Sequence, residues 1–378
     1  MRTRCGCLAF LLLALATGPA AAQRVPEGFR DPEDGRFDLS DYLLTRRGLL
    51  PMPILITEPA LGYGGGLALT YFSQSLAEGA REGRDFAIPT IAGGVGFATA
   101  GGSYGGALFY FQPYKHDRFR ILAALGGASL DLDFFGFDPD GPLSDQPIAY
   151  TIKSVFTGGR LQARFGDTHL FIGAHYSYLR TETAFATPPP EIPEQHLDVN
   201  VAGLGVGLEF DTRDNLLNAL RGMDLTVNAT WFGPSVGGDE SFNKYSAQGL
   251  FYGQPTTQWG YGLRVSSGFA TGDPPFFEKP SLSMRGLPDT KYLNDVTVLA
   301  EAEVRYSMDA RWTLLAFGGS GRVADTWEDI PDASGISAGG LGFRYLIARR
   351  LGLGSGLDFA LGPGSEFAFY IQMGSAWR

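Results

Sequence analysis

Three kinds of side chain in this sequence could do chemistry if their surroundings were right. The run GGSYG, Gly101 to Gly105, matches the nucleophile-elbow pattern of hydrolases, but that pattern has meaning only at a strand-to-helix turn, and here it indicates a tight hairpin. The four histidines have no metal-ligand spacing, and Asp138, Asp140 and Asp145 lack the full calcium-loop pattern. We therefore expect no catalytic residue, no metal and no cofactor.

The N-terminus accounts for the only thiols. Cys5 and Cys7 precede a short apolar run that ends in the small residues Ala20, Ala21 and Ala22. Positive charge, a short apolar run and an A-x-A ending are typical of a signal peptide, which we expect to span 1–22. The run is too short to cross a membrane as a helix. The mature chain would then contain no cysteine, which excludes disulfides and cysteine chemistry.

Composition leaves two classes of protein. The formal charge is −10, and it becomes −12 when Arg2 and Arg4 leave with the signal peptide, so a nucleic-acid binder is not expected. No later apolar run approaches the length of a spanning helix, yet 44% of the residues are hydrophobic, 13% are aromatic and 53 are glycine. These values fit a soluble all-β protein or a transmembrane barrel.

The strand pattern favours the barrel. Segments 223–232, 261–269 and 366–374 alternate apolar residues with polar or small ones. Many such runs reach ten residues, which is long enough to cross a bilayer at a tilt, whereas sandwich strands average about five or six. Aromatic residues gather near segment ends, as interfacial girdles do. The sequence therefore predicts an all-β, transmembrane antiparallel β-barrel.

Marking the segments gives about sixteen strands over 49–378. The longest connections follow odd-numbered strands, at 133–147, 185–196, 270–294 and 324–334, which predicts longer outer loops, short periplasmic turns and both termini in the periplasm. Residues 23–48 would form a periplasmic lead-in, either flexible or a small helix that Asp38 caps and that runs through Arg46. One strand changes phase, and a β-bulge near Ala202 and Gly203 would restore it.

Four stretches resemble the bacterial surface antigen family of outer-membrane barrels, the BamA/TamA-like superfamily. They are LLPMPILITEPALGYGGGLALTYF (49–72), EFDTRDNLLNALRG (209–222), GDPPFFEKPSLSMRGLPDTKYLNDVTVLAEAEVRY (272–306) and GGLGFRYLIARRLGLGSGLDFALG (339–362). The resemblance implies that the loop before the twelfth strand folds into the barrel, with Arg285, Gly286 and Leu287 at its tip.

Two residues depart from the family pattern at this tip. The family's partner for the arginine is an Asp in a Phe-x-Asp-x-Gly run on strand thirteen, where this sequence has Gly319, and the tip aromatic is replaced by Leu287. A buried guanidinium needs a carboxylate. Strand parity places further charged side chains in the lumen, so we hypothesise that Arg285 pairs with Glu301 or Glu303. The predicted network comprises Arg264, Glu301, Glu303, Arg305, Arg344 and Asp358.

The second match is similar to a periplasmic turn of the family. Its proline is replaced by Ala219, and its Asp and Asn side chains can bond nearby backbone N–H groups, so we interpret the motif as structural. The motif residues are Asp211, Thr212, Arg213, Asp214, Asn215 and Gly222.

The resemblance implies a role in inserting proteins, or lipids, into the outer membrane or passing them across it. The stretch before Leu49 is too short for the family's POTRA domains, so clients would come directly or through a separate periplasmic partner. Pro51 and Pro53 cannot donate ladder hydrogen bonds, which predicts a weak seam between first and last strands. A passive channel or specialised transporter is the alternative, and an enzyme is not expected. We expect a monomer surrounded by outer-membrane lipid and lipopolysaccharide.

Overall fold

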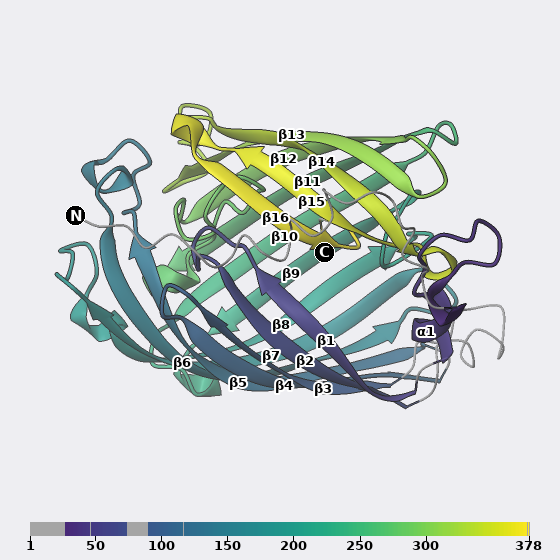
Figure 1. Ribbon diagram of the computed structural model, residues 1–378. Coiled ribbons are helices and arrows are strands. Elements are labelled where there is room, and N and C mark those ends of the chain that lie inside the picture. The colour runs from purple at the N-terminus through teal and green to yellow at the C-terminus, as the bar shows by residue number, and fades with distance from the viewer. Residues whose placement is uncertain (1–26, 46, 74–89, 116, 376, 378) are drawn as a thin grey trace.

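One curled sheet makes up the protein. The computed structural model describes residues 27–45, 47–73, 90–115, 117–375 and 377, so the expected signal peptide lies outside the described residues. Sixteen antiparallel strands follow one another in sequence order, and each pairs with the next, which curls the sheet into a nearly closed barrel (Figure 1). The prediction of an all-β antiparallel barrel of about sixteen strands is confirmed.

The strands are β1 (Gly48–Ile56), β2 (Gly64–Phe72), β3 (Ile91–Thr99), β4 (Tyr104–Tyr114), β5 (Phe119–Phe134), β6 (Ile148–Arg164), β7 (Leu170–Phe185), β8 (Asp198–Asp211), β9 (Gly222–Phe232), β10 (Phe242–Gly253), β11 (Trp259–Gly272), β12 (Val296–Ser307), β13 (Trp312–Ala324), β14 (Ile336–Ala348), β15 (Leu353–Leu361) and β16 (Phe367–Met373). The described residues form one α-helix, α1 (Ser40–Thr45), and short 3-10 helices at Glu27–Phe29, Pro142–Ser144, Glu194–His196, Pro234–Val236, Phe276–Glu278, Arg349–Leu351 and Pro363–Ser365. None of these helices is long and apolar enough to cross a membrane.

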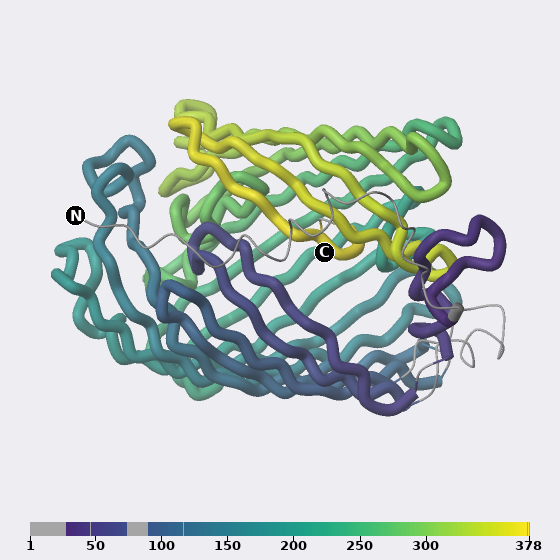
Figure 2. The backbone as a smooth tube through the Cα atoms, viewed as in Figure 1, coloured from purple at the N-terminus to yellow at the C-terminus, as the bar shows by residue number. Residues whose placement is uncertain are grey.

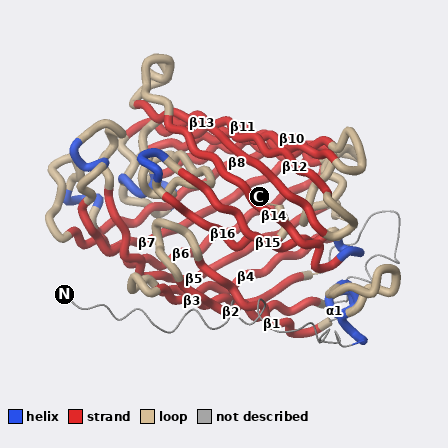
Figure 3. The backbone as a smooth tube through the Cα atoms, turned by 45° about the horizontal axis from the view of Figure 1, so that its top comes forward, coloured by secondary structure: helices blue, strands red, loops and turns tan. Residues whose placement is uncertain are grey.

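The two ends of the barrel differ in their connections. Helix α1 and most of the short connections lie at one end, which we call the turn end. The longer connections that follow β5, β7, β11 and β13 lie at the other, the loop end, where Figure 3 shows the loops and short helices gathered. By the sequence prediction the turn end faces the periplasm.

Strand alternation gives each wall two faces. On β9, Leu225, Val227 and Trp231 are 37%, 52% and 47% exposed and point outward, where the membrane would cover them. Asp224 and Thr230 point inward and are 8% and 9% exposed. Since neighbouring strands stay in register with β9, this parity assigns the inner and outer face of every strand.

The predicted bulge near Ala202 and Gly203 is wrong. Strand β8 stays in continuous register with β7 through these residues, and its pairing with β9 begins at Gly203 without a register shift. Val199 and Val201 instead point inward, where they are 1% and 3% exposed and pack with Phe242. An apolar side chain is stable on the inner face here because the barrel interior at the loop end is filled with apolar groups.

An aromatic cluster closes the loop end. Phe134, Tyr150, Phe185 and Phe276 pack with ring centroids 5.0 to 5.9 Å apart; Tyr150 and Phe185 are stacked, and the other pairs are edge to face or tilted. Strands β5, β6 and β7 supply three of the rings, and the connection after β11 supplies Phe276. This packing holds the base of that connection inside the barrel rim.

Candidate functional site

The connection between β11 and β12, residues 273–295, folds into the lumen; we call it the inward loop. Its two arms are joined by hydrogen bonds, including one from the Leu282 N–H to the Tyr292 carbonyl (2.9 Å), and its tip is a turn closed from Leu287 N–H to the Met284 carbonyl (3.0 Å). Leu282, Met284 and Leu287 are at most 4% exposed and pack against β12, β13 and β14. The tip is therefore fixed on that wall by burial of apolar side chains.

Gly286 stands where the tip turns. Its φ of +101° favours glycine, and a Cβ there would lie 3.0 Å from the Ala338 Cβ and 3.3 Å from the Ala360 Cβ. The Tyr370 hydroxyl accepts a hydrogen bond from the Gly286 N–H at 2.9 Å, which ties the tip to the last strand.

Arg285 is buried among three carboxylates. Its Nε donates to Glu301 at 2.9 Å, and its Nη1 donates to Asp358 at 3.0 Å. The same Nη1 lies 2.7 Å from Glu303 without hydrogen-bond geometry, so that contact is an ion pair. The guanidinium also stacks 3.7 Å from the centre of the Phe317 ring. Arg285 is 7% exposed and the three acids are at most 3% exposed.

Each acid also meets a second positive group. Arg305 donates to Glu303 at 2.7 Å, Arg344 donates to both oxygens of Asp358, and Arg264 lies 3.7 Å from Glu301. The structure thus brings together every residue of the charged network that parity assigned to the lumen. Four arginines surround three carboxylates, an arrangement in which opposite charges alternate and stabilise one another.

The C-terminus enters the same network. Strand β16 ends at Met373, and Gly374, with φ of +78°, turns the chain inward. Trp377 is 4% exposed and donates its indole N–H to Glu301 at 2.8 Å, beside the ring of Tyr252. The sequence analysis, which followed the alternation only to residue 374, did not single out Trp377. The signal that could have found it is the glycine and serine that end the alternation.

The turn motif crosses the turn end. Arg213 pairs with Asp211 (2.8 Å) and Asp224 (2.9 Å), while the Asp214 and Asn215 side chains accept backbone N–H groups inside the turn. Thr212 and Met223 exchange hydrogen bonds, and Gly222 has φ of +98°, where a Cβ would lie 2.2 Å from the Thr212 carbonyl oxygen.

The same motif reaches the opposite wall. The Asn215 amide donates to the Leu351 carbonyl, the Leu217 carbonyl accepts from Ser375, and the Ala219 carbonyl accepts from Arg305. These contacts lay the turn across the barrel mouth, and they connect it to the C-terminal segment.

The two edge strands meet without pairing. Within the described residues, β1 pairs only with β2 and β16 only with β15. Two contacts join β16 to the end of β1 that is nearer the loop end: the Ile371 N–H donates to the Thr57 hydroxyl at 3.4 Å, and Tyr63 stacks on Phe369. At two positions of β1, Pro51 and Pro53 have no N–H to donate. The seam is therefore the least hydrogen-bonded line in the described wall.

Residues 30–45 bridge the seam at the turn end; we call them the N-terminal clasp. The fully buried Arg311 side chain, on the β12–β13 turn, binds Asp31 (2.7 Å), Asp34 (2.7 Å) and Asp38 (2.6 Å). Leu44 packs against the β14–β15 turn, and the chain enters β1 at Gly48 (Figure 2). The first strand is thereby tied to the last quarter of the barrel.

Comparison with known families identifies the chain. The family profile described as the Omp85 superfamily domain matches residues 92–283, just over half of the chain. The chain belongs to the Omp85 superfamily. It is therefore an outer-membrane barrel of the kind that the sequence resemblance implied. A search of functionally curated proteins found no match.

Solved Omp85-type structures share the fold. The chain is 14% identical to BamA from Haemophilus ducreyi lacking POTRA domains 1-3, with a TM-score of 0.59 and coverage of 87% of this chain and 70% of that one. It is 12% identical to CdiB from Escherichia coli (TM-score 0.60; 85% and 61%) and 11% identical to CdiB from Acinetobacter baumannii (TM-score 0.59; 86% and 59%). At these identities the likeness concerns the fold alone, and the chain spans less than two thirds of both CdiB chains.

Gly319 explains how this Omp85 barrel accommodates its missing Asp. A Cβ at Gly319 would lie 2.7 Å from the Met284 sulfur and 2.8 Å from the Ala300 carbonyl, so the loop tip occupies the space an Asp would need. Asp358, from β15, supplies a carboxylate to Arg285 instead. The sequence placed Asp358 on the lumen face but did not single it out as this partner, because parity gives a face and not a distance.

Proposed function

We propose that this barrel inserts proteins into the outer membrane or passes them across it, through the seam between β1 and β16. The observation that carries the proposal is the unpaired seam beside a rigidly held inward loop. An unpaired strand edge presents N–H and C=O groups that can template an incoming strand. Membership of the Omp85 superfamily and the shared fold with BamA and CdiB support the proposal.

Each part of the site has a role in this proposal. The charged network around Arg285 would hold the inward loop against β12–β16, so that this side of the seam stays rigid. The proline-containing β1 would be the side that moves. Clients would arrive at the turn end, directly or through a separate periplasmic partner, after export of the barrel by a signal peptide spanning 1–22.

A disulfide across the seam tests the gate. Thr57→Cys with Ile371→Cys would join residues that already touch across it. The matched control is Leu361→Cys with Phe367→Cys, which joins residues that are already paired between β15 and β16. We expect oxidation to abolish function only in the seam variant, and dithiothreitol to restore it. Full function with a locked seam would contradict the proposal.

Depletion identifies the clients. Outer-membrane proteomics after depletion should show loss of particular barrels or secreted proteins, and re-expression of the wild-type chain should restore them. An unchanged proteome together with a large stable conductance would instead favour the channel or transporter alternative.

A further inference from the structure

Strands β1 to β4 differ from ordinary barrel strands because they carry no charged residue at all. Strand β1 reads GLLPMPILI, apolar on both faces. Barrel strands normally alternate an apolar outer face with a polar inner face. Runs that are apolar on both faces are typical of strands covered by apolar material on both sides.

The inner face of this part of the barrel is a smooth apolar wall. Phe97 and Phe109 lie flat over glycines, since a Cβ on Gly105 would be 2.9 Å from the Phe97 ring and a Cβ on Gly93 would be 2.6 Å from the Phe109 ring. Parity places Met52 of β1 and Leu122 of β5 on the same wall. Although they face the lumen, they are 37% and 44% exposed.

The wall opposite is polar. A lumen cavity of 830 Å³ is lined by Leu130 and Leu132 of β5 as well as by five polar side chains of this wall, those of Asn228, Gln248, Ser266, Lys244 and Arg264. Strands β9 to β11 supply these five side chains. The interior is thus two-sided, with one wall suited to hydrocarbon and one suited to water or a polar group.

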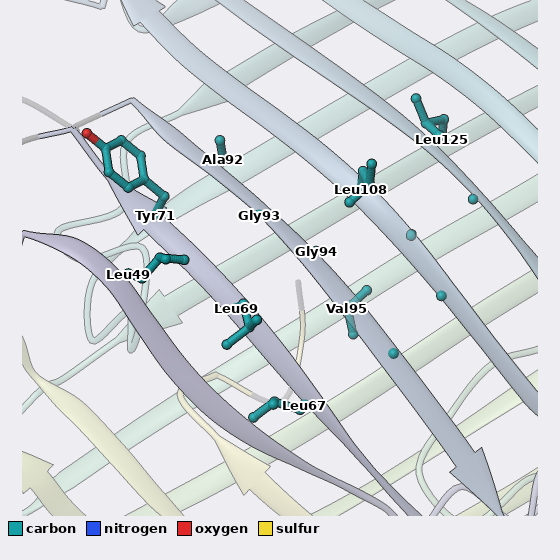
Figure 4. A pocket seen from close by; sticks show the side chains of 14 residues that line it. Leu49, Leu67, Leu69, Tyr71, Ala92, Gly93, Gly94, Val95, Leu108 and Leu125 are labelled. Carbon is teal, nitrogen blue, oxygen red and sulfur yellow. The ribbon is translucent and has the colours of Figure 1, made fainter.

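The outer face of β2 to β5 is apolar too. Leu67, Leu69, Leu108 and Leu125 border a groove of 790 Å³ whose floor contains the glycines of β3 (Figure 4). This surface continues around β1 onto the inner wall, since within the described residues β1 has no second strand partner. Lipid that covers the outer groove therefore meets apolar side chains on both faces of β1, on either side of its unpaired backbone edge.

From this continuity we infer that acyl chains of glycerophospholipids bind the inner wall of β1 to β5, entering through the seam. The charge of the loop end favours phospholipid over lipopolysaccharide. The connections after β5, β7, β9, β11, β13 and β15 contain sixteen Asp and Glu against three Lys and Arg, which repel a phosphate-rich head group. The site deepens the proposed function because it uses the same seam, but it needs no protein client.

Spin labels test the site in the absence of any client. Single cysteines would be placed at Leu122 on the inner wall, at the adjacent lipid-facing Ile121, and at Asn228 on the polar wall. The native cysteines, at 5 and 7, fall inside the expected signal peptide. The nitroxide-labelled mature barrel, in vesicles of phosphatidylethanolamine and phosphatidylglycerol, is then exposed to oxygen, which concentrates in hydrocarbon, or to a water-soluble nickel complex.

The ratio of the nitroxide's collision rate with oxygen to its collision rate with the nickel complex shows whether a label lies in hydrocarbon or in water. We expect the Leu122 label to match the Ile121 label, with a ratio several-fold above that of Asn228. A Leu122 label that behaves like Asn228 would overturn the inference, even if the seam disulfide shows that the gate works. Met52→Cys repeats the measurement at the edge strand, should labelling at Leu122 disturb folding.

Cross-linking in cells identifies the source of the chains. Benzoylphenylalanine in place of Phe109 would capture whatever lies on the wall, and mass spectrometry of the adduct distinguishes the candidates. A glycerophospholipid adduct supports the inference. An adduct of lipid A or of a client protein, without phospholipid, contradicts it.

Discussion

Arg285 shows how a single residue can fix a long loop inside a barrel. Its guanidinium has three acidic partners and an aromatic ring within contact, and all of them come from strands that are otherwise joined only through the sheet. The residue therefore links the loop to β12, β13 and β15 at once. Removing it would leave Glu301, Glu303 and Asp358 buried with less compensation.

The first prediction concerns this link. Arg285→Ala should destabilise the barrel by about 3–5 kcal/mol, because breaking a buried ion pair leaves an uncompensated charge. The urea midpoint and chymotrypsin cleavage within 273–295 measure the effect. Arg180→Ala is the matched control, since its ion pairs with Glu182 and Asp198 are exposed and should contribute at most about 1 kcal/mol. Equal effects in the two variants would refute the anchoring role.

The second prediction concerns pH. Burial, reinforced by the negative charge of Asp289, raises the pKa of Glu58 in the β1–β2 connection to about 7. Its Oε1 is buried with no hydrogen-bond partner among the described residues. The folded protein therefore holds this proton more tightly than the unfolded chain, so stability should fall as pH rises from about 4.5 to about 7.

Urea midpoints measured between pH 5 and pH 8 check this. Glu58→Gln cannot ionise, so its midpoint should fall less over that range than the wild-type midpoint. The exposed Glu191→Gln serves as control and should follow the wild type. Parallel curves for Glu58→Gln and the wild type would show that Glu58 does not titrate in this way.

At the scale of elements, the N-terminal clasp holds the two sides of the seam together at the turn end, where β1 and β16 do not pair with each other. It joins the start of β1 to the turns that flank β13 and β14 through buried ion pairs and the packing of Leu44. Among the described residues, the loop end of the seam is held by the Thr57 hydrogen bond and one ring contact. Opening should therefore begin at the loop end.

The third prediction tests the clasp. Arg311→Ala leaves Asp31, Asp34 and Asp38 close together without their shared cation, so residues 30–45 should detach and exchange backbone hydrogen several-fold faster. Arg36→Ala removes only the exposed pair with Asp309 and should change exchange little. Hydrogen exchange followed by mass spectrometry measures both variants. Unchanged protection in Arg311→Ala would show that packing alone holds the clasp.

Local patterns predicted strands and faces well, because period-two alternation is a property of neighbouring residues. The segment 223–232 became β9, and parity put Glu301, Glu303 and Asp358 on the inner face. Contacts between residues far apart in the sequence could not be predicted from these local patterns. Nothing near Asp31 indicates that it binds Arg311, which is 280 positions away. The bulge near Ala202 and Gly203 was predicted wrongly because apolar residues such as Val199 can face inward where the barrel interior is apolar, and the local sequence does not show what fills the interior.

At the scale of the whole molecule, the lumen is obstructed at three levels. Aromatic rings close the loop end, the inward loop occupies the middle, and the turn motif with Trp377 crosses the turn end. The cavity of 830 Å³, lined by both polar and apolar side chains, lies between these obstructions. These three obstructions leave no wide open channel through the described part of the lumen.

The fourth prediction follows from these obstructions. In planar bilayers the wild-type barrel should show low conductance with rare openings. Replacing residues 280–290 by a short Gly-Ser linker should give larger and more frequent openings, because the middle obstruction is removed. Heat-modified electrophoretic mobility checks that the variant is still folded. A large, stable conductance in the wild type would contradict this account.

The clasp also has a consequence for how the barrel folds. Its binding sites are the turn that carries Arg311 and the turn that carries Leu351, and Arg311 lies 280 positions after Asp31 in the sequence. Contacts of such long sequence separation form late, because the intervening loop must close first. Docking of the clasp therefore reports that the hairpins around β13 and β14 are complete. A chain truncated before Arg311 would lack the cation that binds Asp31, Asp34 and Asp38, so its acidic clasp would stay undocked.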